Sequence, residues 1–189
     1  AHGNVLGRYI DLHYPDSKTD LATAMLERCW GLSKAGGSVA TVSPVHWLFL
    51  RSFRRFRRLV LGARTPNALA RLGPRAFSGI SGEIASVTLF VDSTRPASGK
   101  AFAHIDVTDA ASPALKAVGL QQSELEWLRP DKQLTNPDSV ISASYEGSSS
   151  ALLSDFADGY AGIQTGDLPR FVRMFWEVPD VDGTKWAYY

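Results

Sequence analysis

Cysteine, strong charge of one sign and long apolar runs are all scarce in this sequence. One thiol, Cys29, among 189 residues excludes an internal disulfide framework and any zinc site built from several cysteines. No apolar run approaches the roughly 20 residues of a membrane span, and the first residues lack the charged and apolar parts of a signal peptide. A net charge of +1 means that a nucleic-acid surface would need local clusters of basic residues. These features predict a cytoplasmic protein with no membrane contact.

Common catalytic and metal-binding motifs are missing as well. The sequence has no Gly-x-Ser-x-Gly, no Gly-x-Gly-x-x-Gly, no P-loop and no His-Glu-x-x-His. The four histidines are dispersed and have no cysteine or carboxylate at ligand spacing, which predicts that the chain binds no metal. The residues themselves therefore nominate no catalytic group.

What the sequence does contain is an ordinary globular balance, with 44% hydrophobic and 21% charged residues. Capping side chains at 17–20 predict a helix over 21–32, whose apolar residues at helical spacing would form its buried face: Leu21, Met25, Cys29 and Leu32. Residues 38–43 are rich in β-branched side chains and end at Pro44, which is typical of a strand buried on both faces. The pattern from 46 to 64 then predicts a second helix.

Later segments predict a sheet. Residues 67–72, 83–93 and 101–108 have strand patterns, residues 111–119 and 123–128 resemble short helices, and residues 135–139 form a turn. The first dozen residues carry no clear signal and the chain starts without methionine, so we expect a fragment of a longer protein. The predicted fold is α/β, the second half of a sheet with an antiparallel edge, with a domain boundary near 108.

An arginine-rich stretch places five guanidinium groups within about two helical turns: Arg51, Arg54, Arg55, Arg57 and Arg58. Such a cluster can bind phosphates even on a nearly neutral chain. It can equally be a solvated face whose arginines extend along an apolar helix, and the stretch taken alone favours this second interpretation.

Two further segments have both a functional and a structural interpretation. The loop at 162–178 combines glycines with Thr165, Arg170 and Arg173, which could offer hydrogen-bond donors to phosphates or could simply lead into a buried strand. Phe77 lies between a Gly-Pro turn and a loop of Gly, Ser and Ile. It either packs the loop onto a core or stacks against a flat ligand such as a flipped base.

Three stretches in this order resemble a known family: 21-LATAMLERCWGLSKAGGSVATVSPVHWLFLRSFRRFRRLVL-61, 70-ARLGPRAFSGISGEIASVTLFV-91 and 162-GIQTGDLPRFVRMFWEVP-179. The family comprises the adenine-specific DNA methyltransferases of the BREX phage-defence system, which are similar to the fused restriction-methylation enzymes of type IIG. Its members transfer a methyl group from S-adenosylmethionine to N6 of a flipped adenine. They use a Rossmann-like catalytic domain followed by a target-recognition domain.

The resemblance implies which part of such an enzyme this chain represents. Residues 1–108 would be the C-terminal half of the Rossmann-like methyltransferase domain, after its catalytic Asn-Pro-Pro-Tyr loop. Residues 109–189 would be a connector and the start of the target-recognition domain, with a mixed α/β character. Because the glycine-rich cofactor loop and Asn-Pro-Pro-Tyr are absent, we expect no catalytic residue, no cofactor binding and no activity in the isolated chain. S-adenosylmethionine would serve only the full-length parent.

The resemblance also implies site residues and partners. One wall of the base pocket would consist of Phe77, Ile80, Ser81, Pro44 and Trp47. The DNA-binding residues would be Thr165, Arg170, Arg173, Arg54 and Arg58. DNA is the expected partner, together with the missing N-terminal half or other phage-defence proteins. A non-catalytic DNA-binding or interaction module, such as a split subunit completed by a partner, and an unrelated α/β fold with purely structural aromatics remain alternatives.

Overall fold

The computed structural model describes residues 4–77, 86–95, 98–145, 156–159 and 174–177. The chain divides into two compact units, Ala1–Ser148 and Ser149–Tyr189. In the second unit, a short 3-10 helix spans Phe175–Glu177, and the Met174 amide donates to a Glu177 carboxylate oxygen at 2.8 Å. The sheet and both hydrophobic cores lie in the first unit.

The first unit is built on a five-stranded sheet in the order β1-β3-β2-β4-β5. Strand β3 is antiparallel to β1 and β2, β2 is parallel to β4, and β4 is antiparallel to β5. Strands β1, β2 and β4 therefore run in the same direction and end at the same edge of the sheet. The predicted α/β sheet with an antiparallel edge is confirmed. The strands are β1 (Ser38–Pro44), β2 (Thr65–Gly73), β3 (Val87–Ser93), β4 (Phe102–Asp106) and β5 (Glu126–Leu128).

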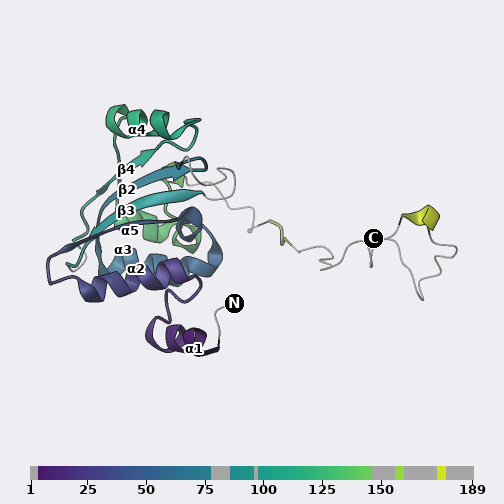
Figure 1. The fold of residues 1–189 in the computed structure, drawn as a ribbon, viewed down its shortest axis with the longest axis horizontal. Helices are drawn as coiled ribbons and strands as arrows, with labels where there is room; N and C mark the ends of the chain where they lie inside the picture. Colours follow the sequence, from purple (N-terminus) through teal and green to yellow (C-terminus); the bar gives the residue numbers. More distant parts are fainter. Residues whose placement is uncertain (1–3, 78–85, 96–97, 146–155, 160–173, 178–189) are drawn as a thin grey trace. The chain divides into compact units, whose positions relative to one another are not determined.

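Helices cover both faces of this sheet. They are α1 (Asn4–His13), α2 (Leu21–Leu32), α3 (Arg54–Ala63), α4 (Pro113–Gln122) and α5 (Pro130–Thr135). Phe90 of β3 packs with Trp30 of α2 and Phe56 of α3 in the main core. Its neighbour Leu89 points to the opposite face, where it belongs to a smaller core with Leu120 of α4. In Figure 1, α4 accordingly lies above the strands, and α2 and α3 lie below them.

The helix predicted over 21–32 is confirmed as α2, and the Asp20 carboxylate caps it by accepting from the Ala22 amide at 2.7 Å. Its predicted buried face is wrong at three of four positions, since only Cys29 packs, half-buried, against the main core. Leu21, Met25 and Leu32 are exposed, and the side chains that face the core are Thr23, Ala24, Leu26 and Trp30. Both stripes are apolar at helical spacing, so the spacing could not distinguish them. The large Trp30 indole, which stacks on Phe56, is the group that the core accommodates.

Strand β1 is not buried on both faces as predicted. Val39 and Ser43 are buried, whereas Val42 is 57% exposed. Within the described residues β1 pairs only with β3, so its second edge has no strand beside it. A strand at the end of a sheet leaves part of its apolar surface open to solvent, which explains the error.

Two other local predictions are wrong, and one helix was not predicted. The helix predicted over 46–64 is divided into two 3-10 helices, η1 (Val45–Leu48) and η2 (Arg51–Phe53), followed by α3. Residues 126–128 form β5 rather than a helix, because the edge of β4 supplies backbone partners to this segment. Residues 4–13 form α1 although their sequence gave no clear signal.

The compact first unit ends at Ser148, beyond the boundary predicted near 108. Strand β5 lies beside β4, with Leu128 opposite Phe102, and Leu128 belongs to the main core. Residues 109–148 thus contribute to the same unit as residues 1–108. The assignment of 109–189 to a connector and the start of a target-recognition domain stays a prediction.

Candidate functional site

The carboxyl ends of β1 and β2 meet at one point of the sheet. Pro44, the last residue of β1, and Gly73, the last residue of β2, are both aligned with Val87 at the start of β3. In sheets with parallel strands, ligands bind outside the carboxyl ends of the strands, where connecting segments supply side chains. A ligand site is therefore expected at this edge of the sheet.

Phe77 lies four positions after Gly73, in the segment that leaves this edge of the sheet. Its side chain is 43% exposed, and it belongs to neither hydrophobic core. Phe77 is therefore not part of a core formed by the described residues, and its role against a base stays a prediction. Ile80 and Ser81, predicted to lie beside it, fall outside the described residues.

The corner after β1 is fixed from inside the core. Trp47 of η1 is 1% exposed, and its indole N–H donates to the Ser43 hydroxyl at 2.9 Å. The indole makes edge contacts with Phe56 and Phe90, at centroid distances of 5.5 and 5.3 Å. Pro44 stands at the half-buried end of the strand. Trp47 therefore supports this corner from inside the core and is not accessible to a ligand. Of the two residues predicted here for the base pocket, only Pro44 is partly exposed.

A buried arginine fastens this corner to a distant turn. Arg57 of α3 is fully buried, and its Nη1 donates to the backbone oxygens of Trp47 at 2.6 Å and Leu50 at 2.8 Å. Its Nη2 donates to the backbone oxygen of Asp138 at 2.9 Å, and its Nε donates to the backbone oxygen of Ser139 at 3.1 Å. Burial lowers the pKa of Arg57 to about 10, so the guanidinium remains charged near neutral pH. The sequence pattern had grouped Arg57 with the phosphate-binding candidates, and the structure removes it from that group.

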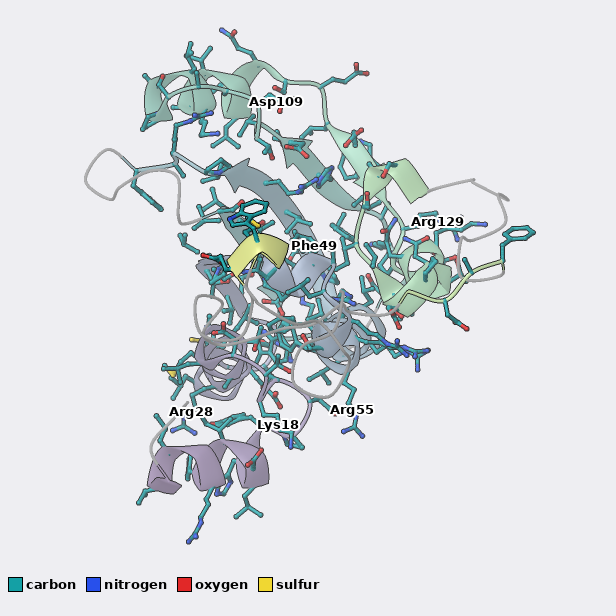
Figure 2. All side chains as sticks on the ribbon, turned by 90° about the vertical axis from the view of Figure 1, so that its right-hand side faces the viewer. Lys18, Arg28, Phe49, Arg55, Asp109 and Arg129 are labelled. Atoms are coloured by element: carbon teal, nitrogen blue, oxygen red, sulfur yellow. The ribbon has the colours of Figure 1, made fainter. Side chains whose placement is uncertain are left out.

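The remaining arginines of the cluster form a solvent-facing surface. We define the arginine surface as Arg51, Arg54, Arg55 and Arg58, all exposed on η2 and α3. Arg55, labelled in Figure 2, extends outward from α3, and its side chain is 75% exposed. The two predicted DNA-binding residues of this region, Arg54 and Arg58, are thus accessible. Thr165, Arg170 and Arg173 lie outside the described residues.

Polar residues that the sequence pattern did not single out line pockets beside β2, β4 and β5. Arg71 of β2 pairs with the Asp106 carboxylate of β4 at 2.8 Å, and His104 Nδ1 lies 2.7 Å from the Glu126 carboxylate. Arg71 borders three cavities of about 490, 300 and 310 Å³. Burial by itself would raise the pKa of the Asp106 carboxyl. Hydrogen bonds from Thr108 and the positive charge of Arg71 outweigh burial and hold this pKa below its usual value. Arg71 and Asp106 are charged residues within otherwise largely apolar strand segments, and this pattern is the sequence signal that could have identified them.

The end of β2 depends on a glycine. Gly73 has φ +66, and an added Cβ would lie 2.6 Å from Thr108 Cγ2 and 3.2 Å from Thr108 Cα. The buried Lys116 ammonium fixes the adjacent strand ends, since it donates to the oxygens of Leu72 at 2.5 Å and Val107 at 3.0 Å. The backbone that leads to Phe77 is therefore held closely against the segment that follows β4.

Gly73→Ala should destabilise the fold by about 2–3 kcal/mol, because it combines a left-handed backbone conformation with a clash against Thr108. Gly99 is a matched control: it has φ +65, but nothing lies within 4 Å of its added Cβ. Gly99→Ala should cost only about 1 kcal/mol. Urea unfolding of both variants measures the difference. Equal losses would show that the approach of Thr108 does not matter.

The described part of the chain shows neither a metal-binding cluster nor a membrane-spanning helix. Its residues contain no group of three or more His, Cys, Asp or Glu side chains placed to hold a metal ion. Among the same residues, no helix has the length and apolar character that a membrane crossing requires.

At least two curated proteins and two solved structures are similar to this chain. No protein-family model matches the chain. The chain is 29% identical to the adenine-specific methyltransferase PglX of Lacticaseibacillus casei (strain Zhang) over 188 aligned residues, which cover 92% of the chain and 16% of PglX. The chain is thus similar to a part of a protein named an adenine-specific methyltransferase. It is also 36% identical to the adenine-specific methyltransferase BrxX of Escherichia coli O9:H4 (strain HS) over 86 residues, which cover 46% of the chain and 7% of BrxX.

The resemblance predicted from the sequence is thus confirmed at the level of these methyltransferase relatives. The chain spans 16% of the length of PglX, so it matches a minor part of that protein. Among solved structures, it is similar to the DrdV–DNA complex, with a TM-score of 0.48, 19% identity and coverage of 66% of this chain and 14% of that one. It is also similar to the type IIG restriction endonuclease BpuSI, with a TM-score of 0.46, 19% identity and coverage of 70% and 17%.

Proposed function

We propose that this chain is part of a site-specific DNA adenine-N6 methyltransferase that uses S-adenosylmethionine and flips its target base. The observation that carries the proposal is the similarity to PglX over 92% of the chain. The order of elements supports it: a helix, a strand that ends at Pro44, and an antiparallel β2–β3 pair connected through Phe77. This is the order expected for the region after an Asn-Pro-Pro-Tyr loop. A cytoplasmic location, where DNA is accessible, belongs to the same proposal.

In this role the carboxyl edge forms one wall of the base pocket. A flipped base needs a flat apolar partner, and a half-exposed aromatic ring beside the strand ends can provide one. We assign this stacking role to Phe77, with Pro44, Ile80 and Ser81 beside it. Arg54 and Arg58 would contact the DNA backbone from α3, and Thr165, Arg170 and Arg173 would contact it from the second unit.

The cofactor would be bound by residues that this chain does not contain. The sequence has neither a glycine-rich cofactor loop nor Asn-Pro-Pro-Tyr, so its residues do not fit S-adenosylmethionine. We therefore propose that the chain is inactive alone and is completed by an N-terminal half that carries both motifs. Two observations support this. Among the residues that the structure describes, no strand pairs with the second edge of β1, and the side chains of Met25, Leu32 and Val42 are exposed. An open strand edge and exposed apolar side chains favour pairing with further strands.

Reconstitution tests the proposal. The chain alone should transfer no labelled methyl group from S-adenosylmethionine to duplex DNA, whereas the chain co-expressed with a methyltransferase segment that carries the glycine-rich cofactor loop and Asn-Pro-Pro-Tyr should methylate adenine N6. Calorimetry should show no cofactor binding to the chain alone. Saturable micromolar binding would place the cofactor site within the chain. A stable but inactive assembly that still binds DNA would instead favour the non-catalytic module, with phage-defence proteins as further partners to test.

A further inference from the structure

The turn at Pro137–Ser139 packs against the arginine surface. The Asp138 carboxylate lies 3.5 Å from Arg54 Nη1 and 4.0 Å from Arg51 Nε. Arg58 Nε donates to the Ser139 hydroxyl at 3.4 Å. The turn thus places one carboxylate and one hydroxyl oxygen against three of the four surface arginines, although it lies about eighty positions later in the sequence.

The backbone of this turn is unusual. Asp138 and Ser139 are consecutive non-glycine residues with positive φ, at 50° and 57°. Such residues cost of order 1–3 kcal/mol each and persist only where the surroundings hold them. Here the buried guanidinium of Arg57 binds the backbone oxygens of both, and Asn136 Nδ2 donates to the Val140 oxygen at 2.7 Å. The backbone of the turn is therefore held by Arg57 and Asn136, independently of the ion pairs that the Asp138 carboxylate makes.

The ion pairs themselves are weak. The side chains of Arg51 and Arg54 are 87% and 45% exposed, and that of Asp138 is 31% exposed. Exposed pairs at these distances contribute little, because water and salt screen them. A stronger anion can therefore replace the carboxylate by rotation of the arginine side chains, without movement of the clamped turn.

Charge and spacing favour a phosphate backbone as that anion. The arginine surface carries four positive charges against two nearby carboxylates, Asp138 and Asp16, the latter 3.5 Å from Arg55. Arg51 of η2 and Arg54 and Arg58 of α3 all contact the 137–139 turn, so they lie on one side of the unit, and their seven positions span roughly 10 Å. That length corresponds to about three nucleotide steps of one DNA strand. Guanidinium groups bind phosphate oxygens through paired hydrogen bonds, which a single carboxylate at 3.5–4.0 Å does not match.

We propose that Asp138 serves, in the free protein, as a substitute for a DNA backbone phosphate by binding the same arginine side chains of the arginine surface. Binding of duplex DNA transfers Arg51 and Arg54 from the Asp138 carboxylate to a phosphate, and Arg58 binds beside them. Asp138 thus opposes DNA binding, because it pairs with Arg51 and Arg54, two of the side chains that would otherwise bind DNA phosphates. This inference rests on the proposed function, since it takes DNA as the partner.

The test uses Asp138→Asn, because asparagine also adopts positive φ and keeps the backbone oxygen that Arg57 binds. Binding of the chain to a labelled duplex of mixed sequence is measured by fluorescence anisotropy between 50 and 200 mM salt. The control is Asp109→Asn, which changes the net charge equally at an exposed position near α4, well away from Arg55 in Figure 2. Circular dichroism confirms that both variants are folded.

We expect Asp138→Asn to bind DNA about 3- to 10-fold more tightly at 50 mM salt, with a log–log salt dependence steeper by about 1. Asp109→Asn should stay within about twofold of the wild type. In an Arg54→Gln background, which should itself flatten the salt dependence by about 1, the gain from Asp138→Asn should shrink. Equal behaviour of the two Asn variants, or weaker binding by Asp138→Asn, overturns the inference and leaves DNA binding intact. A wild-type chain that fails to bind DNA at 50 mM salt overturns both this inference and DNA as the partner.

Discussion

Replacement of Arg57 by methionine should lower the free energy of unfolding by about 3–5 kcal/mol. The guanidinium donates to four backbone oxygens, on the β1 corner and on the 137–139 turn. Methionine fills similar space but donates no hydrogen bond, and each buried acceptor left without a partner costs about 1–3 kcal/mol. The turn would also lose the contact that holds its two residues with positive φ.

Urea unfolding followed by circular dichroism measures this loss, and the melting temperature should fall by roughly 10 °C. Arg55→Met is the matched control, because its side chain is 75% exposed and its removal should change stability by no more than about 0.5 kcal/mol. Arg57→Lys should lie between the two, since one ammonium cannot reach all four oxygens. If Arg57→Met unfolds like Arg55→Met, the guanidinium does not fasten the corner to the turn.

Replacement of Phe77 by alanine should weaken the flipped-base complex of the reconstituted enzyme by about one to two powers of ten. Stacking of a base on an aromatic ring contributes about 1–3 kcal/mol, and alanine removes the ring. Phe77→Trp should retain most of the affinity, because the larger ring also stacks. The stability of the folded chain should change little in either variant, since the Phe77 side chain is 43% exposed.

Phe56→Ala provides the contrasting case, because Phe56 is fully buried between Trp30 and Trp47 and its truncation should cost about 3–5 kcal/mol. Thermal unfolding and DNA methylation measured on the same variants separate the two kinds of aromatic residue. Wild-type methylation by Phe77→Ala, together with a sharp loss of melting temperature, would assign Phe77 to packing and end its role at the base.

The sequence by itself determined the features that depend on local patterns. A capping aspartate and helical spacing predicted α2, a β-branched run that ends at Pro44 predicted β1, and strand patterns between turn signals predicted β2 and β3. Ordered motifs led to the methyltransferase relatives. The arginine cluster and Phe77 could also be named in advance, because their residue types are unusual for their surroundings.

Only the tertiary structure decided what depends on neighbours distant in sequence. Spacing could not choose between two apolar stripes of α2, because the choice depends on where Trp30 meets Phe56. Residues 126–128 became a strand because β4 offered an edge. Five arginines looked alike in the sequence, yet one is fully buried and binds a turn about eighty positions away, while the others stay exposed. The physical reason is common to all three: burial and backbone pairing are set by contacts between distant segments, and a local pattern carries no record of them.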